Sequence, residues 1–123
     1  MTAPPDPVRL RLRLLFGSDV MLGPGKADLL QQIAATGSIS AAGRAMGMSY
    51  KRAWSLVEEM NSAFRAPLVL SVRGGASGGG ASLSETGEAV LAHYRKVVAI
   101  AAAAAEDEIA AIRALLCDIP DGK

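Results

Sequence analysis

Polar side chains able to recognise a polyanion gather within seven residues of this chain: Ser49, Tyr50, Lys51, Arg52 and Ser55. Hydroxyl, ammonium and guanidinium groups donate hydrogen bonds to phosphate oxygens and to the edges of nucleic-acid bases. The large apolar residues that follow, Leu56, Val57 and Met60, fall on one side of a helix. We therefore expect a helix with a buried apolar side and a polar N-terminal end that faces a partner.

A second helix and a tight turn precede this one. Ser38 or Ser40 can cap the earlier helix, and Gly47 can end it in the left-handed conformation. Ser49 can cap the later helix. Small residues occupy the positions where two steeply crossing helices approach closely: Ala42, Gly43 and Ala53. This layout is typical of a helix-turn-helix, whose second helix enters the DNA major groove, although a plain helical pair has the same caps and turn.

A glycine-rich loop follows, between an expected strand at residues 68–72 and a short partner strand at residues 82–83. A phosphate-binding P-loop would need Gly-Lys-Ser/Thr opening a helix, and a dinucleotide site would need a βαβ unit; the sequence has neither. A wing lying along DNA fits better, with phosphate contacts from five of its residues: Arg73, Gly74, Gly75, Ser77 and Gly78. Contacts to the DNA backbone are also expected from the earlier helix, at Ser38, Ser40 and Arg44.

Residues 8–14 alternate between aliphatic residues (Val8, Leu10, Leu12 and Leu14) and arginine, which predicts a strand over residues 8–16 with one buried side. A turn at residues 17–19 and a return strand at residues 20–22 would complete a hairpin. Arg9, Arg11 and Arg13 share the other side; a solvated sheet edge is favoured there over a site for a phosphate or an acidic partner. A helix is expected from Lys26 to Thr36, ended by Gly37.

From Ser84 to about Cys117 the sequence predicts one long helix of roughly 50 Å. Apolar positions along it step by three or four residues, as in a coiled coil: Leu91, Tyr94, Val98, Ala102, Ala105, Ile109, Ile112 and Leu116. A helix of this length extends beyond what a small domain can cover, so the pattern predicts a homodimer. The alternative is an amphipathic helix, broken once, that packs on its own domain.

Composition narrows the class of protein. The 123 residues suggest one domain, and the single cysteine and single histidine exclude an intramolecular disulfide and a Cys/His metal cluster. No convergent catalytic set is visible, so we expect neither an enzyme nor a cofactor. The apolar runs are too short to span a membrane and no secretory signal is visible, so we expect a cytoplasmic protein.

Charge is distributed unevenly along the chain. Residues 9–73 hold nine Lys/Arg and four Asp/Glu, whereas residues 84–123 hold four Lys/Arg and seven Asp/Glu, although the net charge is only +1. A basic N-terminal part and an acidic C-terminal part would orient the protein on a polyanion.

The segments GSIS, SYKRAW and EMN, then GGASGGGASL and Glu85-Thr86-Gly87, resemble the N-terminal domain of the ModE family of molybdate-responsive transcription regulators. The resemblance runs from about Leu10 to about Ala99, and the region is more distantly similar to LysR-type winged helices. It implies control of molybdenum uptake or molybdoenzyme genes. Full-length members carry C-terminal molybdate-binding barrels; because this chain stops near the end of its last helix, we expect no direct molybdate sensing by it.

Together these features predict a mostly α (α+β) winged helix-turn-helix in a single domain of residues 1–123. Residues 8–83 would form the hairpin, helix-turn-helix and wing, and residues 84–117 the long C-terminal dimerisation helix. We expect a transcription regulator that binds double-stranded, palindromic DNA as a homodimer. The alternative is an oxyanion-sensing or protein-docking module with its effector site at the dimer seam or near the three N-terminal arginines.

Overall fold

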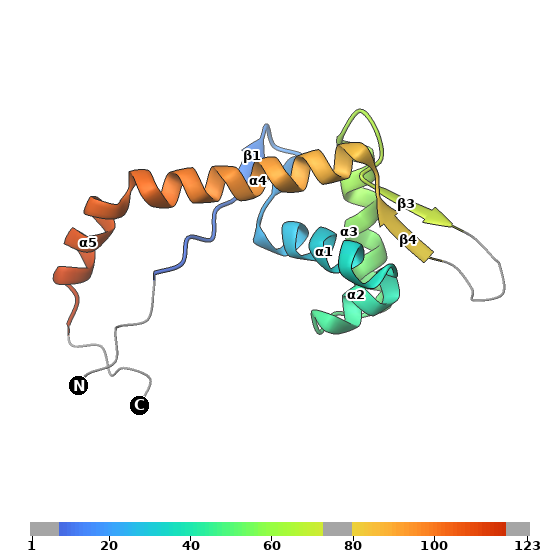
Figure 1. Cartoon of the computed structure of the whole chain (residues 1–123), viewed down its shortest axis with the longest axis horizontal. Coiled ribbons are helices and arrows are strands. Elements are labelled where there is room, and N and C mark those ends of the chain that lie inside the picture. The colour runs from blue at the N-terminus through green and yellow to red at the C-terminus, as the bar shows by residue number, and fades with distance from the viewer. Residues whose placement is uncertain (1–7, 73–79, 118–123) are drawn as a thin grey trace.

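The computed structural model of the chain describes residues 8–72 and 80–117 (Figure 1). These residues form an α+β winged helix in which α1, α2 and α3 lie beneath the long helix α4, and the β3–β4 hairpin projects from one end. The elements are β1 (Leu14–Phe16), β2 (Val20–Leu22), α1 (Pro24–Thr36), α2 (Ile39–Ala45), α3 (Tyr50–Ala63), β3 (Val69–Val72), β4 (Gly80–Leu83), α4 (Glu85–Ala104) and α5 (Glu106–Ala114).

The N-terminal hairpin is shorter than the alternating pattern predicted. β1 pairs antiparallel with β2 from Leu14↔Leu22 to Phe16↔Val20, and the preceding residues 8–13 are not a strand. The expected strand over residues 8–16 is therefore wrong in its first six residues, because β2 is short and the chain leaves it at once to begin α1. The alternation is confirmed from Leu10 to Leu14, because the three leucines are half-buried and the arginines between them are exposed, whereas Val8 is exposed.

The core lies where α1, α2 and α3 meet beneath β4 and the start of α4. α1 begins at Pro24, two residues earlier than expected, because a proline at the first helical position loses no hydrogen bond there. It ends at Gly37 in the left-handed conformation (φ 72°), as predicted. The fully buried large side chains come from α1, α3 and the start of the wing: Leu29, Leu30, Ile33, Val57, Met60 and Leu68.

The crossing of α2 and α3 depends on small residues, as the sequence indicated. Ala42, Gly43 and Ala53 are all buried, and a Cβ added to Gly43 would lie 3.0 Å from the Ala53 Cβ. Gly47 takes a positive φ of 71° in the turn between the helices. The two helices can therefore cross closely because none of these three positions has a side chain larger than a methyl group.

The backbone of residues 67–69 connects three elements. The Asn61 side chain of α3 accepts hydrogen bonds from the N–H groups of Leu68 (2.8 Å) and Val69 (3.0 Å), and it donates to the Val69 carbonyl (3.2 Å). On the other side, the Ser84 hydroxyl donates to the Pro67 carbonyl at 2.6 Å, and the Ser84 N–H donates to the Leu68 carbonyl at 2.9 Å. These bonds fix the wing strand between the end of α3 and the start of α4.

The expected single C-terminal helix is wrong, because the chain turns at Ala105 between α4 and α5 (Figure 1). Ala102, Ala103 and Ala104 are exposed, so no tertiary packing holds the helix straight there. Glu106, Asp107 and Glu108 form the first turn of α5, where acidic side chains stabilise the positive end of a helix dipole.

The first prediction concerns Gly87 in α4. A Cβ at this position would lie 3.0 Å from the Leu68 carbonyl carbon and closer still to its oxygen. Alanine in a helix is ordinarily more stable than glycine by about 1 kcal/mol. We expect Gly87→Ala instead to lower the free energy of unfolding by about 1–3 kcal/mol, because the backbone must move apart. Chemical denaturation measures this change.

The matched control is Ala89→Gly, the reverse substitution at an exposed position of the same helix. It should cost about 0.5–1 kcal/mol through helix propensity alone. A Gly87→Ala protein more stable than the wild type would show that α4 does not approach Leu68 closely in solution.

Candidate nucleic-acid interface

The N-terminal end of α3 presents the polar residues that the sequence singled out. Ser49 is the N-cap, and its hydroxyl accepts a hydrogen bond from the Arg52 N–H at 3.0 Å, as predicted. The side chains of Tyr50, Lys51, Arg52 and Ser55 are exposed, while the opposite side of the helix is buried in the core. Each side chain is therefore available to a partner that approaches along the first two turns of the helix.

Tyr50 and Trp54 form an edge-to-face aromatic pair on α3, with ring centroids 6.2 Å apart and planes at 76°. Trp54 is half-buried and packs against the core. Tyr50 is 56% exposed. The pair limits the directions in which the Tyr50 hydroxyl can point.

α2 contributes a second polar edge, and the structure resolves which serine caps it. Ser38 is the N-cap and accepts from the Ala41 N–H at 3.0 Å. Ser40 instead accepts from Arg44 Nη1 at 2.8 Å, so the alternative cap at Ser40 is wrong. The guanidinium of Arg44 remains exposed and is oriented by this hydrogen bond.

The wing is a two-stranded hairpin with the register Val69↔Leu83 to Val72↔Gly80, so β4 is two residues longer than predicted. Its β4 strand is attached to the link between α1 and α2, because the Ala81 N–H donates to the Gly37 carbonyl at 2.8 Å. The expected wing contacts at Arg73, Gly74, Gly75, Ser77 and Gly78 lie outside the described residues. The wing base and the helix-turn-helix are thus parts of one packed unit.

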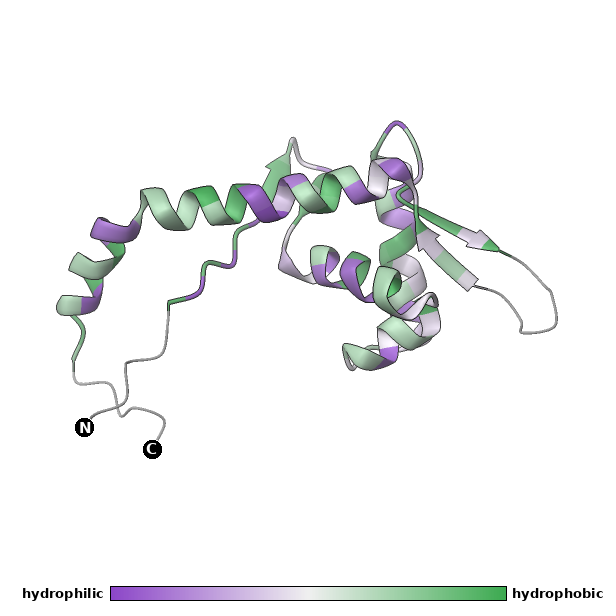
Figure 2. Cartoon of the chain, in the orientation of Figure 1, coloured by the Kyte–Doolittle hydropathy of each residue, from purple (hydrophilic) through white to green (hydrophobic). Residues whose placement is uncertain are grey.

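The large residues of the predicted seam that lie in α4 face the domain and not solvent. Tyr94 is 2% exposed, and Leu91 and Val98 pack against its own domain, so a continuous surface seam is wrong in this half. A different stripe of α4 is free, and Figure 2 shows apolar residues continuing along its distal half. Sequence reasoning missed its two large members, Val97 and Ile100, because they are three residues apart, as Leu91 and Tyr94 of the buried set are.

α5 and the two residues after it contain the distal part of the predicted seam, which is only partly exposed. Ile112 and Leu116 are exposed, Leu115 is 85% exposed, and Ile109 is half-buried.

An ion pair between Lys26 and Glu59 connects α1 to α3. Lys26 is held by the Met21 carbonyl at 2.9 Å and by Glu59 Oε1 at 3.0 Å, which joins α1 to the side of α3 away from the core. Nothing in the sequence pattern indicated this pair.

Residues 8–72 and 80–117 contain no group of three or more His, Cys, Asp or Glu side chains that could hold a metal ion. In the same ranges, no helix is both long enough and apolar enough to cross a membrane.

No protein-family model matches the chain. Individual proteins do. A stretch of 78 residues is 46% identical to the molybdenum-pterin-binding protein MopB of Rhodobacter capsulatus and covers 63% of this chain and 29% of MopB. The molybdenum transport protein ModE of Azotobacter vinelandii is 37% identical over 89 residues, which is 71% of this chain and 33% of that protein.

The DNA-binding transcriptional dual regulator ModE of Escherichia coli K12 is 37% identical over 83 residues, 68% of this chain and 32% of that protein. The chain spans about a third of the length of these relatives. The predicted resemblance to the ModE family is thereby confirmed, and a ModE-family domain fits the matched region of this chain.

Proposed function

We propose that this chain is a sequence-specific DNA-binding transcription regulator. The observation that carries the proposal is the free N-terminal end of α3, capped by Ser49, with Tyr50, Lys51, Arg52 and Ser55 exposed on it. An exposed helix start of this kind enters the major groove in helix-turn-helix proteins. The printed name of the Escherichia coli relative, a DNA-binding transcriptional dual regulator, supports the same function.

The residues divide into two roles. Ser49, Tyr50, Lys51, Arg52 and Ser55 would contact base edges and the phosphates beside them. Contacts that only position the protein on the DNA backbone would come from Ser38, Ser40 and Arg44 of α2 and from the wing residues Arg73, Gly74, Gly75, Ser77 and Gly78. The relatives' names support target genes connected with molybdenum.

The regulator acts as a homodimer on a palindrome in this proposal. The free stripe of α4 carries His93, Val97, Ile100 and Ala104, which step by four, three and four residues and suit helix pairing. Two paired chains would place two α3 helices about one DNA turn, ~34 Å, or a multiple of it, apart.

The second prediction separates base contacts from phosphate contacts. Lys51→Ala should weaken binding to the preferred DNA site by about 1–3 kcal/mol and relax the preference at one base pair. Arg44→Ala should instead lower the slope of log affinity against log salt by about 0.9, because one phosphate contact is lost. Fluorescence anisotropy on duplexes selected from a random pool, at several salt concentrations, measures both effects.

Lys96→Ala, which removes an exposed charge from α4, is the control and should leave affinity unchanged. Unaltered affinity in the Lys51→Ala/Arg52→Ala double variant would contradict the assignment of α3 as the reading helix.

The third prediction tests the dimer surface. Ile100 is 67% exposed, and burying an isoleucine contributes about 1.5–3 kcal/mol. Ile100→Glu should therefore raise the dimer dissociation constant by about tenfold or more, measured by sedimentation velocity. Ala99→Glu places the same charge about 100° around the same helix and should have little effect. Equal association of both variants would exclude this stripe as the interface.

The fourth prediction is that molybdate does not stabilise this chain. Within the described residues no polar or charged side chain is fully buried, and Arg9, Arg11 and Arg13 are solvated. A ligand at 100 times its dissociation constant would add about 2.7 kcal/mol to the free energy of unfolding. We expect no shift of Tm on adding sodium molybdate, with sodium sulfate as the control. A rise specific to molybdate would favour the oxyanion-sensing alternative, which Arg11→Ala would then test.

A further inference from the structure

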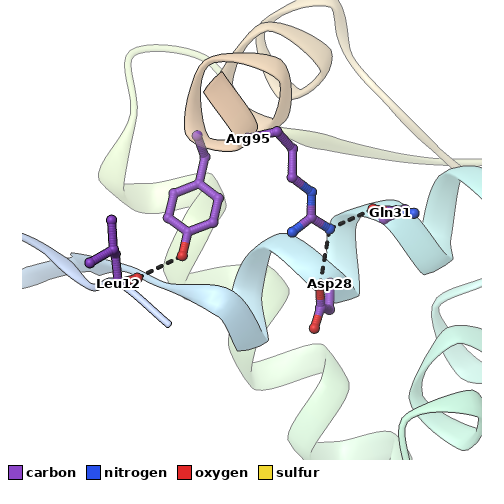
Figure 3. A network of polar contacts seen from close by, with 5 residues as sticks. Leu12, Asp28, Gln31 and Arg95 are labelled. Atoms are coloured by element: carbon purple, nitrogen blue, oxygen red, sulfur yellow. Dashed lines mark hydrogen bonds and ion pairs between the residues drawn. The ribbon is translucent and has the colours of Figure 1, made fainter. Parts of the chain in front are cut away.

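In addition to the apolar packing of Leu91 and Val98, two consecutive residues of α4 make polar contacts with the rest of the domain (Figure 3). The Tyr94 hydroxyl donates to the Leu12 carbonyl at 2.6 Å, and burial raises the Tyr94 pKa, which keeps this donor protonated. The Arg95 guanidinium points the other way, toward α1, where its Nη2 donates to Asp28 Oδ1 at 3.0 Å and to Gln31 Oε1. The first contact fixes α4 to the N-terminal segment, and the second fixes α4 to α1.

α1 belongs to the same packed unit as the reading helix. Its residues Leu29, Leu30 and Ile33 share one core with Leu56 and Met60 of α3. The Ala81–Gly37 hydrogen bond joins the wing to the end of α1. A contact between Arg95 and α1 therefore orients α4 relative to α1, α3 and the wing, which pack as one unit.

The effect of the Arg95 contact on the tilt of α4 depends on where Arg95 lies along this helix. α4 is fixed at one end by the close approach of Gly87 to Leu68, and Arg95 lies eight residues, about 12 Å, further along. A tilt of about 10° about Gly87 would displace the far end of a helix of roughly 30 Å by about 5 Å. Each DNA base pair changes the separation of two half-sites by about 3.4 Å. A tilt of this size thus displaces the far end of α4 by a distance similar to the rise of one or two base pairs, while each base pair also rotates a half-site by about 35° about the DNA axis.

We propose that Arg95 is a positioning residue that sets the spacing between the two DNA half-sites by fixing the tilt of α4. This inference rests on the proposed function, in which α4 pairs with α4 of a second copy. Arg95 contacts α1 and lies on a different helix from the proposed base-reading side chains, so its loss changes the relative placement of the two α3 helices and leaves each helix intact.

The contact is accessible to water, which makes the inference testable by substitution. The Arg95 and Asp28 side chains are 41% and 47% exposed, and a hollow of about 370 Å³ lies beside them, lined also by Gln31, Gln32 and Met46. A solvated ion pair contributes little to folding stability. Arg95→Met retains the aliphatic part of the side chain and should fold.

The first experiment measures the tilt without DNA. Spin labels at Ala45→Cys in α2 and Ala103→Cys in α4, both exposed positions, report the distance between the two parts in a Cys117→Ser background. Labelled chains diluted with unlabelled chains remove distances between copies. We expect a narrow distance distribution for the wild type, a broader one for Arg95→Met, and a narrow one again for the exchanged pair Arg95→Glu/Asp28→Arg. Lys96→Met is the matched control and should leave the distribution narrow.

The second experiment measures spacing. A duplex selected from a random pool by the wild-type chain is lengthened or shortened by one and two base pairs at its centre. We expect Arg95→Met to bind a single half-site as the wild type does, but to discriminate between spacings less by about threefold to tenfold. The exchanged pair should recover the discrimination, and Lys96→Met should keep it.

The outcomes separate the inference from the function on which it depends. If the wild-type chain selects no duplex, or selects one without two half-sites, the proposed function fails and the inference fails with it. If the wild type discriminates between spacings and Arg95→Met discriminates equally well, the inference alone is overturned. An unchanged label distribution in Arg95→Met overturns it independently of DNA.

Discussion

The hydrogen bonding of residues 67–69 is the constraint on which the arrangement of this domain depends. The side chain of Asn61 satisfies this short backbone segment from α3, and Ser84 satisfies it from the start of α4. Buried or half-buried backbone groups must find partners, so the three bonds of Asn61 determine where the wing strand leaves α3. The same segment admits α4 only because Gly87 has no Cβ. One stretch of backbone thus positions α3, the wing and α4 together.

In this arrangement the two ends of the molecule differ in the kind of side chains that they expose. The polar end of α3 and the edge of α2 carry exposed cations, whereas the distal part of α4 and α5 carry exposed apolar side chains and the acidic turn at residues 106–108. The acidic turn repels a polyanion and the cationic edge attracts it, so charge would orient a polyanion that approaches the domain before any specific contact forms. Between the ends, Tyr94 and Arg95 connect α4 to both neighbours. Because these two residues lie between the ends, the position of distal α4 and α5 is connected through them to the position of α1 and of the helices packed against it.

The sequence predicted those parts of the fold that are determined by neighbouring residues. Ser49 and Gly37 act within one helical turn of themselves, and the small residues at Gly43 and Ala53 are required by a single crossing, so the caps and the helix-turn-helix could be inferred. The length of β1 could not, since the alternation continues through residues 8–13 where the structure provides no partner strand beside them. Neither could the pair of Lys26 and Glu59, which are 33 positions apart in sequence.

The helix α4 shows why spacing alone does not identify an interface. A four-three pattern of apolar residues arises on any helix that lies along a surface, whether that surface belongs to the same chain or to a second copy. In α4 both kinds of stripe are present: Tyr94 and Val98 face the domain, and Val97 and Ile100 face solvent. What separates them is the Leu12 carbonyl, because a tyrosine hydroxyl needs a partner when its ring is buried, and the N-terminal segment supplies it. The N-terminal segment therefore helps to determine which side of α4 stays free, through the Leu12 carbonyl and through Leu14, which packs against the same cluster as Tyr94.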